Sequence, residues 1–197
     1  PMQGGAIIKG EYPAGVNSYF QYGNTIQSMV VSLSAFGMMS MSRITETINA
    51  LTGLSMSDAT VNNMILSCSD KCKKQLPELR KLLLESYSIG FDETGIRVGG
   101  KNHWMHTAST KDLTLLVSSP KRGKPGIDEC GVLPHFKGVA VHDCWSSYYN
   151  EDYAGATHSL CCAHIDRELQ GVNDNYKQRW SKQMQKLLMS MYVNKAK

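Results

Sequence analysis

Two aspartates stand where predicted buried strands end, and a pair of acids in such places can hold a divalent metal ion. Asp92 ends the run Ser-Ile-Gly-Phe-Asp, and Asp143 ends the run Val-Ala-Val-His-Asp. A buried, unpaired carboxylate is unfavourable, so each acid needs a metal, a cation or several hydrogen-bond donors. Oxygen ligands suit Mg²⁺ or Mn²⁺, and two such ions about 3.5–4 Å apart would support in-line attack on a phosphodiester. Helix capping or turn formation is the alternative role for these aspartates.

Cysteine and histidine gather near residue 160, which suggests a comparison with zinc sites. Cys161, Cys162 and His164 lie together, with His158 nearby. Their spacing fits no familiar zinc module, and a second Cys-x-x-Cys pair is missing, so we expect core cysteines instead. His142 and His164 either border the acidic site, with His164 against a phosphate, or are packed imidazoles.

The most concentrated basic segment contains Lys121, Arg122 and Lys124, interleaved with glycines that let the backbone approach a phosphate. Contact with a DNA backbone would add affinity without sequence readout, and a solvated loop is the alternative. Aromatic residues close to the predicted strands could stack on splayed bases, although aromatics in such places are mostly core. They are Trp104, Trp145, Tyr148 and Tyr149.

The elements that must position these residues follow from hydrophobic periodicity. Extended segments are predicted at 88–92 and 95–98, which together count as the first strand, and further strands at 101–108, 113–118, 137–142 and 158–162. Helical segments are predicted at 127–133, 146–149 and from 165 onward. A hairpin should turn at Gly99 and Gly100. The order is three meandering antiparallel strands, then helices alternating with parallel strands. This order predicts an α/β fold with a mixed sheet of the ribonuclease H-like type, in which Asp92 and Asp143 face each other on central strands.

The sequence before residue 88 predicts helices. Residues 1–17 are rich in Gly and Pro and indicate an extended arm or linker, whereas apolar spacing indicates helices at 19–39, 42–51 and 77–87. Gly53 is a natural helix stop, and Ser57 can cap a further helix from residue 58. We therefore assign 18–87 to a helical region. It contains either a DNA-binding helix-turn-helix or a plain helical hairpin.

Composition restricts the class of protein without deciding it. The 197 residues are 42% hydrophobic and 19% charged, which is globular, and the net charge of +4 permits a polyanionic partner without requiring one. Six cysteines without a signal peptide favour reduced thiols in a cytoplasm-like compartment. The most apolar stretch, 29–41, is shorter than the roughly 20 residues of a membrane span.

A series of short motifs resembles, in order, the insertion sequence 66 family of transposases. The motifs are Asp92-Glu-Thr-Gly-Ile-Arg-Val, His103-Trp, Ala108-Ser-Thr, Lys121-Arg-Gly, Leu133-Pro, Val141-His-Asp, Trp145-Ser-Ser-Tyr, Cys162-Ala-His and Arg167-Glu-Leu. The similarity runs from about Tyr22 to the end of the chain. It implies a DNA transposase with a catalytic Asp-Asp-Glu triad on a ribonuclease H-like core, cutting and joining transposon ends with Mg²⁺ or Mn²⁺.

The resemblance assigns Asp92 and Asp143 to the two aspartate positions, as catalytic residues and metal ligands. It implies a final Glu after a helical insertion, which 179–197 would begin, so 88–178 would be an incomplete core and the third acid would lie beyond Lys197. Glu168 follows Asp143 by 25 residues (168 − 143), a spacing that a simpler ribonuclease H-like enzyme tolerates, and it is the alternative third ligand or an ion-pair partner of Arg167. Glu93 should point to the opposite face of its strand from Asp92.

The same resemblance implies partners and a location. The partners would be transposon-end and target DNA, with a homo-oligomer assembled on them, in a bacterial-type cytoplasm without membrane attachment and at the nucleoid when bound to DNA. Lys121, Arg122, Lys124, His164 and Arg167 are the expected DNA contacts. The alternatives are a catalytically inactive remnant that only binds DNA or partners, and a ribonuclease or resolvase, which would need its full acidic set within this chain.

Overall fold

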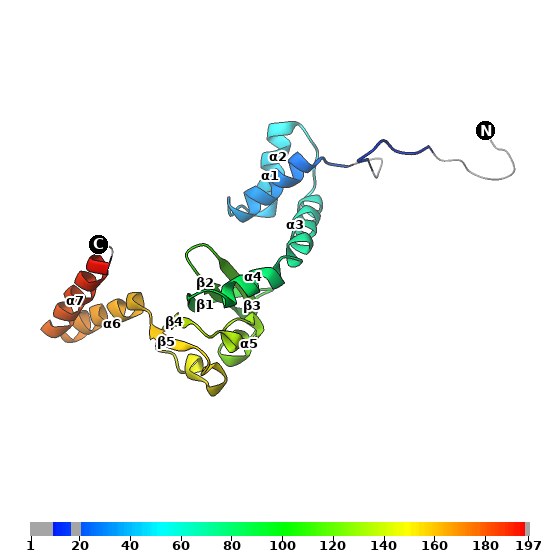
Figure 1. The fold of residues 1–197 in the computed structure, drawn as a ribbon. Coiled ribbons are helices and arrows are strands. Elements are labelled where there is room, and N and C mark those ends of the chain that lie inside the picture. Colours follow the sequence, from blue (N-terminus) through cyan, green and yellow to red (C-terminus); the bar gives the residue numbers. More distant parts are fainter. Residues whose placement is uncertain (1–9, 17–20, 196–197) are drawn as a thin grey trace. The chain divides into compact units, whose positions relative to one another are not determined.

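The computed structural model describes residues 10–16 and 21–195, and the chain divides into two compact units, Pro1–Lys74 and Gln75–Lys197 (Figure 1). Most of the arm expected at 1–17, and the start of the helix expected at 19, lie outside the described residues. Within the described part of that arm, a turn is closed by a hydrogen bond from the Val16 amide to the Pro13 carbonyl over 3.0 Å.

The first unit contains three helices around a small apolar core. They are α1 (Asn24–Ala35), α2 (Met41–Thr52) and α3 (Asp58–Lys73), and the buried core residues are Val30, Ile44, Ile48, Met56 and Val61. The predicted stop at Gly53 is confirmed, because this glycine ends α2 with a φ of 69°. The predicted cap is confirmed too, because Ser57 Oγ accepts the Thr60 amide at 3.3 Å.

A side chain fixes the turn between α2 and α3. Asn49 Oδ1 accepts the Met56 amide at 2.8 Å, and its Nδ2 donates to the Met56 carbonyl at 3.0 Å. Both backbone groups of Met56 are therefore satisfied while its side chain enters the core. The turn is well defined, and its use as a helix-turn-helix stays a prediction.

The second unit is built on a five-stranded mixed sheet in the order β3-β2-β1-β4-β5. The strands are β1 (Ser88–Val98), β2 (Lys101–Ser109), β3 (Thr114–Ser119), β4 (Val139–His142) and β5 (Thr157–Leu160). β1, β2 and β3 pair antiparallel, whereas β4 pairs parallel with β1 and β5 parallel with β4. This order and these directions are those of a ribonuclease H-like core, which confirms the predicted fold class.

Several boundaries differ from the predicted ones. β1 is one strand of 11 residues that runs through Gly95, and it turns into β2 at Gly99 and Gly100, both at positive φ. The helix expected from 127 begins earlier, as α5 (Lys124–Cys130), because Pro125 suits a first turn. The remaining elements are three short 3₁₀ turns, η1 (Leu133–His135), η2 (Ser146–Tyr149) and η3 (Glu151–Tyr153), and two helices, α6 (Cys162–Tyr176) and α7 (Arg179–Lys195).

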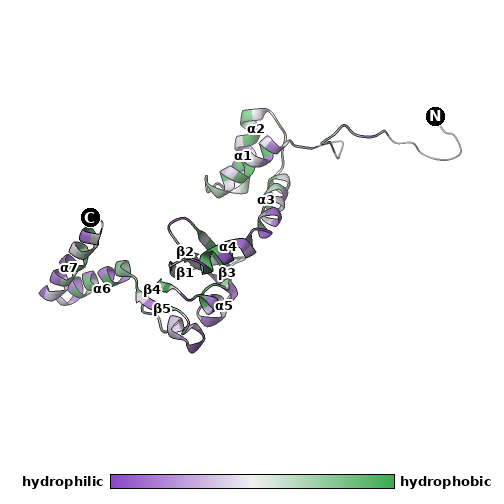
Figure 2. Ribbon diagram, in the orientation of Figure 1, coloured by the Kyte–Doolittle hydropathy of each residue, from purple (hydrophilic) through white to green (hydrophobic). Residues whose placement is uncertain are grey.

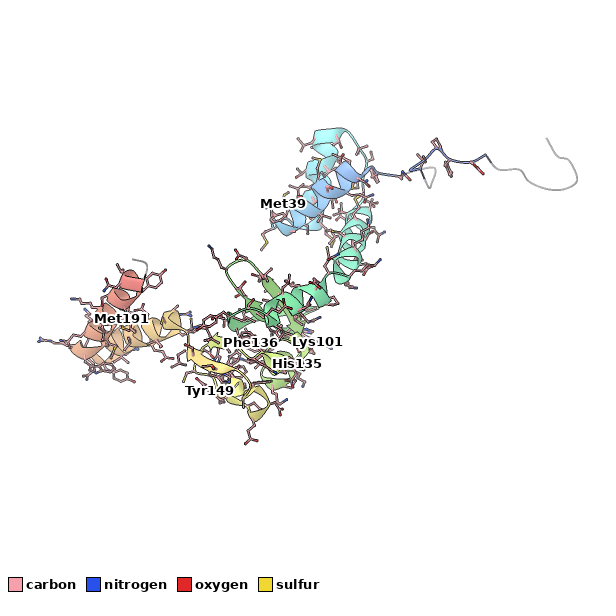
Figure 3. All side chains as sticks on the ribbon, in the orientation of Figure 1. Met39, Lys101, His135, Phe136, Tyr149 and Met191 are labelled. Carbon is pink, nitrogen blue, oxygen red and sulfur yellow. The ribbon has the colours of Figure 1, made fainter. Side chains whose placement is uncertain are left out.

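The main core lies on one face of the sheet. Ile89, Phe91 and Ala140 alternate with less buried neighbours along β1 and β4, as expected of strands covered on that face. Phe136, labelled in Figure 3, meets Phe91 edge to face with ring centroids 6.1 Å apart. Leu83 of α4 (Leu76–Leu84) is fully buried in the same core, so α4 belongs with the sheet although sequence reasoning grouped it with the preceding helices.

The helix predicted from residue 165 to the end is interrupted. α6 ends at Lys177, which has a φ of 54°, and α7 then packs against α6. α7 mixes hydrophobic and hydrophilic residues along its length (Figure 2), and several large apolar side chains on it are exposed. Across the described part of the chain, no helix combines the length and apolar character that a membrane crossing requires.

Candidate active site

Asp92 and Asp143 occupy corresponding positions on the two central parallel strands. In the β1–β4 pairing, Gly90 lies opposite Val141, an offset of 51 residues (141 − 90). The same offset separates Asp92 from Asp143 (143 − 92 = 51). Asp143 directly follows the last residue of β4. The pairing ends at Gly90 and Val141, and continuation of the same register for two residues would direct both acids to one face, opposite the buried Phe91 and His142.

A backbone amide donates a hydrogen bond to each of the two carboxylates. Oδ1 of Asp92 accepts the Glu93 amide at 2.9 Å, and Oδ1 of Asp143 accepts the Trp145 amide at 3.0 Å. Asp92 is exposed and Asp143 is partly buried. The ion pairs formed among the described residues all use other acids. Each of these aspartates is therefore held by a backbone donor while its charge is left without a basic partner in that part of the chain.

Glu93, next to Asp92, is the most enclosed acid of the site, with a side chain only 1% exposed. Its Oε1 accepts hydrogen bonds from Nε and Nη2 of Arg122 at 3.1 and 2.8 Å, and its Oε2 accepts from the Tyr148 hydroxyl at 2.6 Å. Sequence reasoning placed Glu93 on the opposite face from Asp92 but did not identify this network. The nearby Arg122 and Tyr148 gave no local signal, because they lie 29 and 55 residues away.

Arg122 packs against two indole rings, although its side chain is 45% exposed. Its guanidinium lies over the ring of Trp104 on β2 at 4.6 Å and over that of Trp145 at 4.2 Å. Its hydrogen bonds to Glu93 use two of the five N–H donors of the guanidinium. Trp104 and Trp145 therefore contact a cation of the protein itself, in the place where sequence reasoning considered bases or a plain core.

Tyr148 is buried where several negative charges converge. Burial raises the pKa of Tyr148 far above its ordinary value, and the hydrogen bond to Glu93 and the charges of Glu93, Asp143 and Asp92 raise it further. Tyr148 therefore remains a neutral hydrogen-bond donor at any physiological pH.

The other two cations of the predicted DNA-binding loop have different environments. Lys124 Nζ pairs with Asp128 at 2.7 Å and with Asp152 at 2.9 Å. Partial burial opposes ionisation of Asp128, but hydrogen bonds from Lys124 and Tyr153 outweigh it and lower the pKa of this carboxyl. Lys121 is exposed. Lys121 takes part in none of the ion pairs formed among the described residues.

The histidines of β4 and β5 form a packed pair. His142, only 1% exposed, lies with Nε2 2.8 Å from His158 Nδ1 and with Nδ1 2.6 Å from the Asp143 carbonyl. Its ring stacks on Tyr148 at a centroid distance of 4.5 Å, and Tyr149, labelled in Figure 3, meets its edge. This geometry corresponds to the second alternative for His142, a packed imidazole. The ring lies beside the backbone of Asp143.

The predicted site residues of α6 lie apart from a metal cluster. Among the described residues, no three His, Cys, Asp or Glu side chains gather in a metal-binding arrangement, so Glu168 does not group with Asp92 and Asp143. Glu168 is exposed, and Arg167 donates to the Ala163 carbonyl at 3.3 Å. Nδ1 of the partly buried His164 is enclosed without a hydrogen-bond partner in the described structure. Cys161 is partly buried and Cys162 is exposed, so neither is the core cysteine expected.

The strand order and the paired aspartates define a ribonuclease H-like domain with acidic residues on its central strands. The profile of the Transposase IS66 family matches residues 20–197, and the chain belongs to this family. No curated protein matches the chain significantly.

Two solved structures share part of the fold. One is the HTLV-2 integrase catalytic core domain in complex with magnesium, in a trimeric form, at 12% identity and a TM-score of 0.33 over 54% of this chain and 84% of that one. The other is a simian T-cell lymphotropic virus intasome in complex with the PP2A regulatory subunit B56 gamma, at 12% identity and a TM-score of 0.34 over 78% and 62%. These likenesses are weak, and the fold assignment rests on the strand order and directions given above.

Proposed function

We propose that this protein is a DNA transposase that uses Asp92 and Asp143 to bind Mg²⁺ or Mn²⁺ during cleavage and strand transfer of transposon ends. The observation that carries the proposal is an equal offset: Asp92 and Asp143 are 51 residues apart (143 − 92), as are the paired residues Gly90 and Val141 of β1 and β4 (141 − 90). Membership of a transposase family supplies the class of reaction. The substrate and partner would accordingly be transposon-end and target DNA, bound by an oligomer of this chain.

The residues present fit a hard divalent cation. Two carboxylates directed to one face repel each other, and a cation between them relieves that repulsion. Mg²⁺ commonly binds through one or two carboxylates and keeps several waters or substrate oxygens, so two acids are a workable donor set. Such a metal would supply activation of a water or 3′-hydroxyl and stabilisation of the leaving oxygen. The backbone amides of Glu93 and Trp145 orient the two carboxylates for this role.

The exposed cations define the proposed DNA contacts. Lys121 and Arg167 are exposed, so these two are the candidate phosphate contacts, whereas the unpaired Nδ1 of His164 is enclosed and does not support that role. Arg122 and Lys124, which the sequence also suggested, are engaged by acids of the chain. We assign them structural roles in the proposal.

Cleavage of a labelled transposon-end duplex tests the proposal against a chain that only binds DNA. We expect Asp92→Asn and Asp143→Asn each to abolish Mg²⁺-dependent cleavage while DNA affinity stays within about twofold. Asp112→Asn, which changes an exposed aspartate in the turn before β3, is the matched control and should cleave normally. Undiminished cleavage by either of the first two variants refutes the catalytic assignment. DNA binding without cleavage by the unmodified chain would favour the binding-only alternative.

A further inference from the structure

We propose that Glu93, Arg122 and Tyr148 form a positioning network around the buried Glu93 carboxylate that holds the turn carrying Asp143 against β1. The inference rests on the proposed function, because it concerns how that same acidic pair is held ready for a metal. In this proposal Arg122 supports the site through its bonds to Glu93 and does not bind the DNA backbone. The network joins three segments that are distant in sequence: β1, the loop after β3, and the turn after β4.

Burial explains why the network holds together. The Glu93 side chain is 1% exposed, and a carboxylate removed from water is stable only when its oxygens are paired. Arg122 provides two hydrogen bonds to one oxygen, and Tyr148 provides one to the other. Displacement of the turn after β4 would remove the Tyr148 donor and leave a buried oxygen without a partner. Glu93 therefore links the position of this turn to the strand that carries Asp92.

Arginine suits its place in the network better than lysine. The flat guanidinium contacts Trp104 and Trp145 while it also donates two hydrogen bonds in its own plane. A lysine ammonium could keep the charge but could not fill the same space between two indole rings. Gly123 allows the close approach of this loop, because its φ is 77° and an added Cβ would lie 3.3 Å from the Trp145 ring.

The network reaches Asp143 from both sides. On the C-terminal side, the amide of Trp145, whose ring lies against Arg122, donates to Asp143 Oδ1 at 3.0 Å. On the N-terminal side, the Tyr148 ring stacks on His142, whose Nδ1 lies 2.6 Å from the Asp143 carbonyl. The Tyr148 amide also donates to the Trp145 carbonyl at 3.1 Å, which closes the turn. Loss of the ion pair should therefore loosen the Asp143 carboxylate itself.

The test compares Arg122→Lys and Glu93→Gln with two matched controls, Arg97→Lys and Glu129→Gln, which make the same changes at exposed residues. Mn²⁺ affinity is measured by calorimetry, and protection of the Trp145 amide is measured by hydrogen exchange. We expect each network variant to bind Mn²⁺ about tenfold or more weakly, in the range found when partners of metal ligands are removed. The Trp145 amide should exchange at least tenfold faster in these variants and at the normal rate in the controls.

A milder variant covers the case in which the others do not fold. Tyr148→Phe keeps the ring and removes only the hydroxyl, and it should show the same two effects in smaller measure. If Asp92→Asn and Asp143→Asn abolish Mn²⁺ binding while the network variants bind it normally, the positioning role is wrong and the proposed function stands. If the unmodified chain binds no Mn²⁺, the proposed function fails, and the Trp145 exchange rates still decide whether the network holds the turn. Unchanged exchange in Arg122→Lys or Glu93→Gln overturns the inference.

Discussion

The Tyr148 hydroxyl donates a hydrogen bond to Glu93 Oε2 over 2.6 Å, joining residues that are 55 positions apart. Because the acceptor belongs to a buried carboxylate, removal of the donor leaves a charged oxygen without a partner. We expect Tyr148→Phe to reduce the free energy of unfolding by about 1–3 kcal/mol, measured by urea denaturation. Tyr149→Phe, at a neighbouring ring that is 48% exposed, should change it little. Equal stability of the two variants would contradict the importance of this bond.

Leu83 tests whether α4 is part of the sheet unit. Its side chain is fully buried in the core that contains Ile89 and Phe91, whereas the adjacent Leu82 is 42% exposed. We expect Leu83→Ala to lower the free energy of unfolding by about 2–5 kcal/mol, since a buried leucine is replaced by a cavity. Leu82→Ala is the control and should cost well under half as much. A similar loss in both variants would show that α4 is not packed as described.

The six cysteines should differ in reactivity. Burial raises the pKa of the Cys130 thiol to about 11, although the charge of Arg80 acts in the other direction. An ordinary thiol has a pKa of about 8.5, so at pH 8 the thiolate fraction of Cys130 should be smaller by about a hundredfold. Alkylation followed by peptide mass spectrometry should therefore label the exposed Cys144 and Cys162 long before Cys130. Early labelling of Cys130 in the folded protein would contradict its burial.

The stability contributed by Asp128 should depend on pH. Partial burial opposes its ionisation, but hydrogen bonds from Lys124 and Tyr153 prevail and lower its pKa in the folded protein. A lowered pKa stabilises the fold above the ordinary carboxyl value, near pH 4, and this contribution disappears as the pH falls through the lower, folded value. We expect Asp128→Asn to reduce stability at pH 7 by about 1 kcal/mol or less, because the pair is partly exposed. The difference from the unmodified protein should vanish near pH 2, and a gap that persists there would contradict this origin.

Sequence periodicity was sufficient for the order of the main elements and for the place of Asp143 directly after a strand, because alternation and strand ends are local properties. Gly53 and Ser57 were predictable for the same reason, since helix stops and caps depend on a few neighbouring residues. Asp92 was expected at a strand end, but β1 continues through it to Val98. The role of Glu93 was not predictable. Its partners come from two other segments, and only the folded sheet brings them together.

Exposure was also misjudged where tertiary contacts decide it. Lys124 belongs to the most basic segment of the sequence and was therefore expected to contact DNA. It lies at the start of α5, where Asp128 and Asp152 pair with it. For the loop around Arg122 the sequence left DNA contact and a solvated loop open. Gly123 in this loop allows a close approach to Trp145.

Calorimetric titration with Mn²⁺ tests most directly whether the acids on β1 and β4 hold a metal together. The unmodified protein should bind Mn²⁺, and Asp92→Asn and Asp143→Asn should each weaken binding by at least about tenfold, while Asp112→Asn should bind normally. Combining the two substitutions should weaken binding little more than either one alone, because both acids serve one site. Normal Mn²⁺ affinity in either single variant would contradict the shared site.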